Sequence, residues 1–284
     1  MKILVTGING QLGHDVLREG IKRGMDMIGA GREQLDITNK EEVFQYVNRV
    51  KPEAIIHCAA YTAVDKAEDD RDNCWNVNVL GTKYIADAAK EVNAKLIYIS
   101  TDYVFDGKGE QPFVETDEPN PVGYYGLTKY EGEKYVQDLL DESFIVRISW
   151  VFGINGNNFI KTMLRLAESR RELNVVADQY GSPTYTLDLS RLIIDMVQTE
   201  KYGIYHASNE GYCTWAEFAK KIFEKANRDT MVNTIMTEDY PTRAIRPKNS
   251  RLLKRKLVKE DFKPLPEWQD ALTRYLNELN QEVK

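Results

Sequence analysis

The chain has 284 residues, of which 42% are hydrophobic and 29% charged, and its formal net charge is −6, from 38 Lys and Arg against 44 Asp and Glu. This length fits one large domain or two closely joined ones, with a core that needs no disulfides. Because the charge is mildly negative and no basic tract is present, the composition argues against nucleic acid as the main partner.

The first half of the chain alternates short apolar runs with helical patterns. Such alternation predicts βαβ units and a parallel sheet, and right-handed crossovers make that sheet doubly wound. The expected strands are 3–5, 25–30, 54–57, 95–100 and 144–148, and the expected helices are 11–23, 41–50, 73–92 and 122–141.

After Trp150 this alternation loosens. Thr214 is followed three residues later by Glu217, a capping-box pattern that marks a helix start. The stretch 229–266 is rich in Pro, Thr, Arg and Lys, so we expect irregular backbone on the surface there. The other expected elements are helices at 157–170, 186–199, 214–226 and 267–280 and strands at 173–177 and 203–206.

The predicted fold class is α/β, a Rossmann-type doubly wound parallel sheet with a smaller C-terminal substrate-binding lobe. We expect residues 1–150 to form the dinucleotide-binding domain. Residues 151–284 then form mainly the substrate-binding lobe, with segments of about 172–206 returning to the Rossmann sheet.

Three cysteines and three histidines are scattered through the chain. Their spacing predicts neither a disulfide framework nor a zinc site, and no metal ligand is assigned. An apolar strand begins at Lys2 without the pattern of a signal peptide, and no run reaches the roughly 18 apolar residues of a membrane span. We therefore expect a cytoplasmic protein with no membrane partner.

A glycine-rich turn follows the first strand, with glycines at Gly7, Gly10 and Gly13. Glycines at such positions let the backbone turn tightly, approach a phosphate and pack a helix on a strand. The spacing is GxxGxxG, which is a weak signal alone, and the βαβ context supports it. We expect a dinucleotide here, with contacts also from Asn9, Gln11 and Leu12.

The end of the second strand indicates which dinucleotide is used. An acidic residue at this place would hold the ribose 2′-hydroxyl of NAD, whereas Arg32 could neutralise the 2′-phosphate of NADP. Glu33 weakens the inference, and a solvated surface arginine is an equal alternative. We expect NADPH, with tolerance for NADH.

Two Tyr-Lys pairs with four-residue spacing occur in the helix at 122–141, Tyr125–Lys129 and Tyr130–Lys134. A tyrosine can protonate a developing alkoxide, and a nearby ammonium lowers the phenol pKa. Five positions turn the pairs roughly 140° apart on a helix, so at most one pair can face a cofactor. Its place in the first helical turn, after the loop at 118–124, favours Tyr125.

Hydroxyl side chains end the strand that precedes this helix. Open α/β sheets bind ligands at the carboxyl ends of their strands, where a hydroxyl can hydrogen-bond a substrate carbonyl. We assign this role to Thr101, with Ser100 as the second candidate. Tyr125, Lys129 and Thr101 are therefore the predicted catalytic residues.

Several sequence blocks resemble those of the extended short-chain dehydrogenases/reductases, and within them the dTDP-4-dehydrorhamnose reductase family. The likeness covers nearly the whole chain, and STDYVFDG, DQxGxPT and RPxNS are the most specific blocks. The blocks are 7–13, 59–68, 100–107, 125–129, 147–150, 156–159, 178–184 and 246–250.

This resemblance implies that NADPH reduces the 4-keto group of dTDP-4-dehydro-β-L-rhamnose to give dTDP-L-rhamnose, a precursor of cell-surface polysaccharide. Tyr125 would donate the proton, Lys129 would lower the tyrosine pKa and bind the nicotinamide ribose, and Thr101 would hold the keto oxygen.

The resemblance also implies contacts for further residues. A purely structural role is an equal alternative for Trp150 in the core, for Arg246 at the surface and for Asn78 in its helix. Implied cofactor contacts are Asp36, Ile37, Ala60, Tyr61, Thr62 and Ser100, and implied substrate contacts are Asp102, Tyr103, Trp150, Asn158, Arg246 and Asn249.

Two other functions stay open. A sugar-nucleotide epimerase or 4,6-dehydratase shares the same core motifs, but a dehydratase needs Asp-Glu after the threonine, whereas Asp102 is followed by Tyr103. A non-catalytic subunit resembling the regulatory subunit of methionine adenosyltransferase is the second. Some relatives form homodimers with magnesium, and the sequence leaves both the dimer and Mg²⁺ open.

Overall fold

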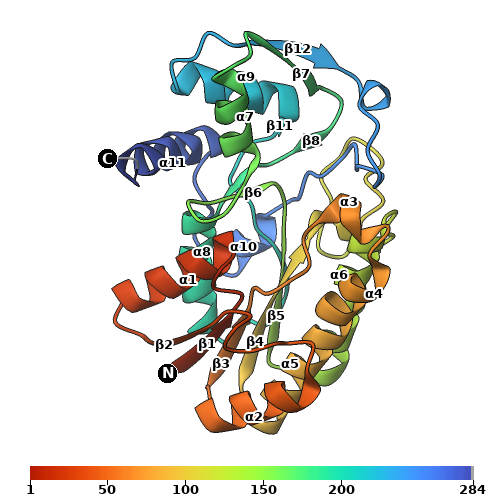
Figure 1. Cartoon of the computed structure of the whole chain (residues 1–284). Helices are drawn as coiled ribbons and strands as arrows, with labels where there is room; N and C mark the ends of the chain where they lie inside the picture. Colours follow the sequence, from red (N-terminus) through yellow and green to blue (C-terminus); the bar gives the residue numbers. More distant parts are fainter. Residues whose placement is uncertain (283–284) are drawn as a thin grey trace.

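The computed structural model describes residues 1–282 and contains a six-stranded, all-parallel sheet. The strand order β10-β5-β4-β3-β1-β2 reverses direction between β1 and β3, and helices cover both faces (Figure 1). This arrangement is the doubly wound sheet that the sequence predicts. The strands are β1 (Lys2–Thr6), β2 (Asp26–Ala30), β3 (Ala54–His57), β4 (Lys95–Thr101), β5 (Ser143–Ile148) and β10 (Gly203–His206).

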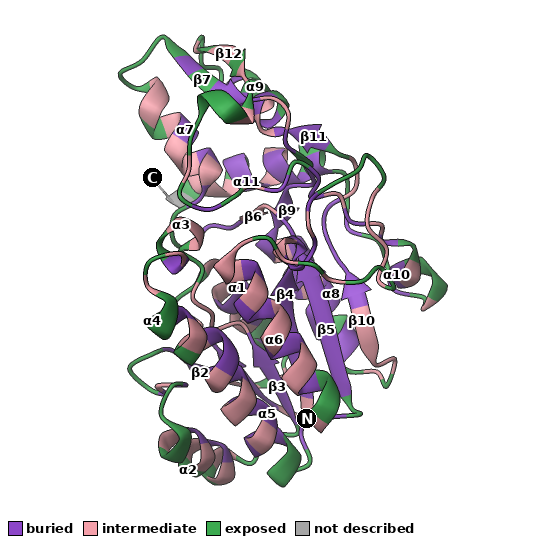
Figure 2. Cartoon of the chain, turned by 90° about the vertical axis from the view of Figure 1, so that its right-hand side faces the viewer, coloured by how far each residue is buried: buried purple, intermediate pink, exposed green. Residues whose placement is uncertain are grey.

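The central strands are buried on both faces, as their unbroken apolar runs require. Every residue of β3 and β5 is buried, and β10 pairs with β5 from Gly203 opposite Phe144 to His206 opposite Arg147. Figure 2 shows this buried sheet between the helical layers. Parallel pairing places the carboxyl ends of all six strands along one edge of the sheet.

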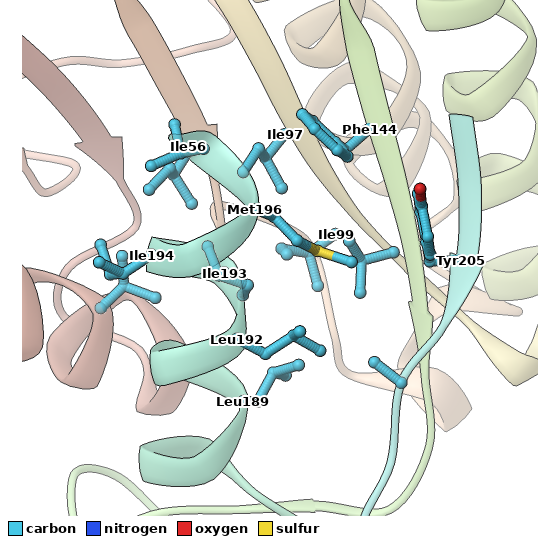
Figure 3. Close-up of a cluster of buried hydrophobic side chains, with 14 of the residues drawn as sticks. Ile56, Ile97, Ile99, Phe144, Leu189, Leu192, Ile193, Ile194, Met196 and Tyr205 are labelled. Carbon is cyan, nitrogen blue, oxygen red and sulfur yellow. The ribbon is translucent and has the colours of Figure 1, made fainter. Parts of the chain in front are cut away.

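Two helical layers cover the sheet. On one face α8 packs its apolar side chains, among them Leu189, Ile193 and Met196, onto the side chains of β3, β4 and β5 (Figure 3). The other face is covered by α2, α5 and α6. The helices beside the sheet are α1 (Gln11–Lys22), α2 (Lys40–Val50), α3 (Val64–Ala67), α4 (Arg71–Trp75), α5 (Thr82–Glu91), α6 (Tyr124–Leu139), α8 (Thr186–Val197) and α10 (Arg255–Lys259).

A smaller lobe lies beyond the carboxyl ends of the strands (Figure 1). Its own core joins aromatic and aliphatic side chains of short strands and three helices, including Phe152 of the strand Val151–Phe152, Phe218 and Tyr275. Its elements are β6 (Val151–Phe152), α7 (Phe159–Ala167), β7 (Glu172–Val176), β8 (Tyr180–Gly181), β9 (Thr184–Tyr185), β11 (Cys213–Thr214), α9 (Trp215–Lys225), β12 (Met231–Ile235) and α11 (Trp268–Glu282).

The stretch 229–266 is more regular than the sequence predicts. Residues Met231–Ile235 form β12, which pairs in parallel with β7, and Arg255–Lys259 form α10. A short 3₁₀ turn lies in the same stretch at Thr237–Asp239, and a second one lies outside it, at Asp102–Val104. The expectation of irregular backbone throughout was wrong, because a strand whose partner lies about 60 residues away has no local signature.

The helix expected at 73–92 is interrupted. Residues Asn76–Gly81 form a π-helical turn between α4 and α5. Such turns insert an extra residue into a helix and occur frequently at functional sites. By contrast, the capping box at Thr214 and Glu217 is formed at the start of α9 as predicted. Among residues 1–282, no helix is both long and apolar enough to cross a membrane.

Candidate active site

A cavity of about 700 Å³ lies at the carboxyl ends of β1 to β5 and reaches the first residues of the smaller lobe. Doubly wound sheets bind ligands at this place, beside the point where the strand order reverses between β1 and β3. Its lining brings together most of the predicted residues: Gly7, Asn9, Gly10, Gln11, Leu12, Gly13, Arg32, Asp36, Ile37, Ala60, Tyr61, Thr62, Ser100, Thr101, Asp102, Tyr103, Tyr125, Lys129 and Trp150.

The glycine-rich turn forms one wall of this cavity. Gly7 has a φ of +70°, and a Cβ there would lie 2.6 Å from the backbone nitrogen of Ala59. A Cβ at Gly13 would lie 2.3 Å from the carbonyl oxygen of Gly7. Side chains at these two positions would therefore push the turn away from the third strand and the first helix.

Helix α1 presents its N-terminus to the cavity. Its N-cap is Gly10, no side chain caps the helix, and no acidic residue lies in its first turn. Free amide groups and the positive end of the helix dipole favour a bound anion such as a pyrophosphate. The turn and helix therefore fit a dinucleotide.

The end of β2 supplies the groups that would face the adenosine half of a bound dinucleotide. The exposed Arg32 lines the cavity, whereas its neighbour Glu33 does not. The carboxylate of Asp36 accepts hydrogen bonds from the backbone and hydroxyl of Thr38, at 3.0 and 2.7 Å, which lower its pKa. Ile37 packs against the π-helical turn at Gly81.

Tyr125 lies in the first turn of α6, next to the end of β4. Its ring meets the edge of Tyr103 with centroids 5.6 Å apart. Burial raises the pKa of Tyr125 above its usual value, and hydrogen bonding with Thr101 opposes this shift. This direction is opposite to the lowering that the sequence predicts from Lys129, because burial outweighs the hydrogen bond with Thr101.

The N-terminus of α6 is fixed by a distant carboxylate. Gly123 at the N-cap offers no side chain, and the backbone amide of Tyr124 donates instead to Glu68, at 2.7 Å. A carboxylate at a helix N-terminus is stabilising. Glu68 thus holds the backbone residue that directly precedes Tyr125.

Lys129 is buried one turn farther along α6. Burial lowers the pKa of its ammonium to about 7, while the negative charge of Glu133 raises it in part. Glu133 itself is fully engaged, because it pairs with the buried Arg147, at 2.7 Å, and accepts a hydrogen bond from Ser100. Ser100 therefore lines the cavity but directs its hydroxyl into this ion pair.

Asp102 is buried beside Thr101, whose hydroxyl donates to its carboxylate Oδ1 at 3.1 Å. Its other oxygen, Oδ2, is buried without a hydrogen-bond partner in residues 1–282. Burial raises the pKa of Asp102 to about 6. An unsatisfied buried carboxylate oxygen at the cavity wall is costly unless a ligand reaches it.

The segment Ala60–Thr62 is held by Asn78 in the π-helical turn. Asn78 accepts a hydrogen bond from the amide of Tyr61, at 2.8 Å, and donates to the Tyr61 carbonyl, at 3.2 Å. It also donates to Thr128, at 3.0 Å, next to Lys129. Asn78 therefore links this cavity wall to α6.

Trp150 forms part of the cavity wall toward the smaller lobe. Its backbone has a φ of +47°, a left-handed conformation that is rare for a tryptophan. The indole stacks on Trp215 with ring centroids 3.7 Å apart. A Cβ at Gly181 would lie 2.5 Å from this ring, so glycine is needed there.

Three predicted substrate contacts lie outside the cavity lining. Arg246 donates to the hydroxyl of Tyr103, at 3.0 Å, and pairs with Asp65. The amide of Asn158 donates to Gln11, at 3.1 Å, and to Gly153 and Tyr275, and its oxygen caps α7. Asn249 donates to the carbonyls of Lys108 and Gln111.

The cavity lining also contains residues that were not predicted, among them Asn157 and Cys58. Asn157 lines the cavity in place of its neighbour Asn158, and the block 156–159 signalled the loop but not which asparagine faces the cavity. Cys58 lines it at the end of β3, where burial raises the pKa of the thiol to about 12. A single cysteine carried no motif that would have singled it out. No group of three acidic, cysteine or histidine side chains suited to a metal ion occurs in residues 1–282.

A glycine turn beneath a helix N-terminus, with a Tyr-Lys pair and a strand-end threonine across the same cavity, defines a Rossmann-type protein of the short-chain dehydrogenase/reductase class. The chain belongs to the RmlD substrate binding domain family, whose profile matches residues 1–281.

Individual relatives of known structure or function support this family assignment. The dTDP-4-dehydrorhamnose reductase of Aggregatibacter actinomycetemcomitans is 43% identical over 285 residues, which cover 95% of this chain and 97% of the relative. A crystal structure of a dTDP-4-dehydrorhamnose reductase from Clostridium acetobutylicum superimposes with a TM-score of 0.96 at 42% identity, covering 99% of this chain and 100% of that one. The Bacillus anthracis enzyme, solved in complex with NADP, gives a TM-score of 0.95 at 45% identity and covers 98% and 100%.

Proposed function

We propose that the protein reduces the 4-keto group of dTDP-4-dehydro-β-L-rhamnose with NADPH to form dTDP-L-rhamnose. The observation that carries this proposal is the single cavity that Tyr125, Lys129 and Thr101 share with the glycine turn. The relatives named as dTDP-4-dehydrorhamnose reductases, which match nearly the whole chain, support the choice of substrate.

The dinucleotide would be held by the glycine turn, by the N-terminus of α1 and by the segment Ala60–Thr62. Arg32 would face the 2′-phosphate, because it lines the cavity whereas Glu33 does not. The NADP complex of the Bacillus anthracis relative supports the same choice. When bound, the cofactor supplies a hydride.

Tyr125 would donate the proton that neutralises the developing alkoxide. Its raised pKa keeps the phenol protonated at neutral pH, as an acid catalyst must be before the reaction. Thr101 would hold the keto oxygen beside it, and the ammonium of Lys129 would stabilise the phenolate that remains.

The sugar nucleotide would enter from the smaller lobe, between Trp150 and the 3₁₀ turn at Asp102–Val104. The free oxygen of Asp102 suits a sugar hydroxyl, and the Trp150 indole suits a flat sugar or base face. Arg246 would reach the diphosphate by leaving Asp65. Residues 1–150 would thus serve mainly the cofactor and 151–284 mainly the substrate.

The test is a spectrophotometric assay of NADPH and NADH oxidation against a panel of 4-keto sugar nucleotides. We expect rapid NADPH oxidation with the 4-keto-rhamnose nucleotide and a product that no longer carries a ketone. A protein that returns an isomer of its substrate without consuming NADPH would instead be an epimerase.

A further inference from the structure

The ammonium of Lys129 has an unusual environment for a buried cation. No carboxylate lies within ion-pair distance of it in residues 1–282. Its Nζ lies instead over the ring of Tyr98, 4.0 Å from the centroid, and Tyr98 is completely buried. A buried charge needs compensation, and an aromatic face can provide it by a cation–π interaction.

The hydroxyl of the same tyrosine contacts the same lysine. Tyr98 Oη donates to the backbone carbonyl of Lys129, at 3.1 Å. The hydroxyl fits only because residue 132 is glycine, since a Cβ there would lie 2.4 Å from Tyr98 Oη. Glycine inside a helix lowers the stability of the helix. The space that Tyr98 Oη needs explains why glycine nevertheless occupies position 132.

A stacking contact also fixes the Tyr98 ring. It stacks on His57, with centroids 5.9 Å apart and an interplanar angle of 25°. The Nδ1 of His57 hydrogen-bonds the hydroxyl of Thr6, at 2.8 Å, and its Nε2 lies 3.3 Å from Thr82. Because Thr6 directly precedes Gly7, a continuous buried row joins the glycine turn to the lysine.

We propose that Tyr98 is a positioning residue for Lys129, with its ring compensating the ammonium in place of a carboxylate and its hydroxyl holding the helical turn that carries it. This inference rests on the proposed role of Lys129 in binding the cofactor ribose and stabilising the Tyr125 phenolate. The titratable groups that face the ammonium from the surrounding elements are Glu133, His57, Cys58 and Cys74, and Tyr125 lines the same cavity.

The ring and the hydroxyl can be separated by substitution. Tyr98→Leu removes the ring, whereas Tyr98→Phe removes only the hydroxyl. The matched control is Tyr205→Leu: Tyr205 is equally buried, has Lys256 Nζ 4.3 Å from its centroid, and donates to a backbone carbonyl. It lies on the opposite face of the sheet, among the α8 contacts (Figure 3).

The readout is NADPH affinity between pH 6 and 10, measured by titration without any sugar nucleotide. In the wild type, affinity should weaken as rising pH removes the Lys129 proton. Tyr98→Leu should move this weakening about one pH unit lower and weaken binding about tenfold at neutral pH, the scale of a desolvated cation–π contact. Tyr98→Phe should lose about threefold without the shift, and Tyr205→Leu should keep the wild-type pH profile.

A wild-type pH profile in Tyr98→Leu, or an equal shift in Tyr98→Phe, would overturn the proposal. If Tyr98→Leu does not fold, fluorinated phenylalanines at position 98 keep the shape and weaken the ring face stepwise; a graded shift supports the proposal, and no gradation refutes it. NADPH binding with no reduction of any keto sugar by the wild type would defeat the proposed function alone.

Discussion

The two faces of α6 carry the same motif in different surroundings. On the inner face, Lys129 is buried among aromatic and polar side chains. On the outer face, the side chain of Lys134 is 44% exposed and pairs with Glu131 at 2.6 Å. Tyr130 packs beside a small cluster around Phe105, outside the cavity lining.

This contrast shows that the Tyr-x-x-x-Lys spacing alone makes no active site. Burial lowers the pKa of Lys129, whereas the carboxylate of Glu131 raises the pKa of Lys134. A lysine with a lowered pKa beside a cavity can change its protonation state when a ligand binds. A lysine that is paired with a surface carboxylate stays protonated and cannot do so. Substitutions on the two faces of α6, and in the ion pair behind Lys129, should therefore have unequal effects.

The largest effect is expected for the buried ion pair behind Lys129. Arg147→Met would leave Glu133 charged and buried without its partner, at a cost of about 3–5 kcal/mol in the free energy of unfolding. The matched outer change, Lys134→Met, removes a surface pair and should cost less than about 1 kcal/mol. Urea denaturation of both variants measures the difference, and equal losses would contradict the contrast.

The next effect concerns the chemistry. Tyr125→Phe removes the proton donor and should lower kcat by about two decades or more, the scale of general acid catalysis. NADPH affinity should change little, because the ring remains. Stopped-flow and steady-state assays check both numbers, and a variant as fast as the wild type would show that another group donates the proton.

The third effect is the pH dependence of stability. The folded-state pKa of Lys129, about 7, is below its usual value of 10.5, so the unfolded chain binds the proton more tightly between these pH values. Lys129 therefore destabilises the fold below pH 7, and this penalty is relieved as the pH rises from about 7 to 10.5. Lys129→Met should be inactive yet more stable at pH 7 by up to about 5 kcal/mol, the free-energy equivalent of the difference between these two pKa values. Unfolding measured at pH 7 and pH 10 tests this, since a penalty of another origin would not vanish at high pH.

The smallest effect is expected on the outer face. Tyr130→Phe keeps the ring packing and lies outside the cavity, so kcat and NADPH affinity should stay within about twofold of the wild type, and stability within about 0.5 kcal/mol. The same assays provide the number. A tenfold loss of kcat would move the acid catalyst to the other face of the helix.

Sequence reasoning predicted the sheet and the cavity because both depend on local signals. Apolar runs alternating with helices produce the parallel sheet, and the glycine turn and Tyr125 each lie next to a strand end. The choice of Tyr125 over Tyr130 came from its position in the first turn of α6, which the structure places at the cavity.

The rest depends on contacts between distant segments. Strand β12 pairs with β7 across about 60 residues, and the π-helical turn depends on what Asn78 meets outside its own helix. Arg147 lies in an apolar run and its partner Glu133 in a polar helix, so neither pattern revealed that both are buried. Tyr98 carries no motif, and only its place beneath Lys129 gives it a role.

Isotope transfer tests the central claim most directly. NADPH carrying deuterium at both C4 positions would be incubated with the purified protein and the 4-keto-rhamnose nucleotide. We predict one deuterium at sugar carbon 4 and one equivalent of NADP formed for each product. The rate of this label transfer should fall by about two decades or more in Tyr125→Phe and stay unchanged in Tyr130→Phe. An unlabelled sugar product, or labelled product formed equally fast by both variants, would contradict the account.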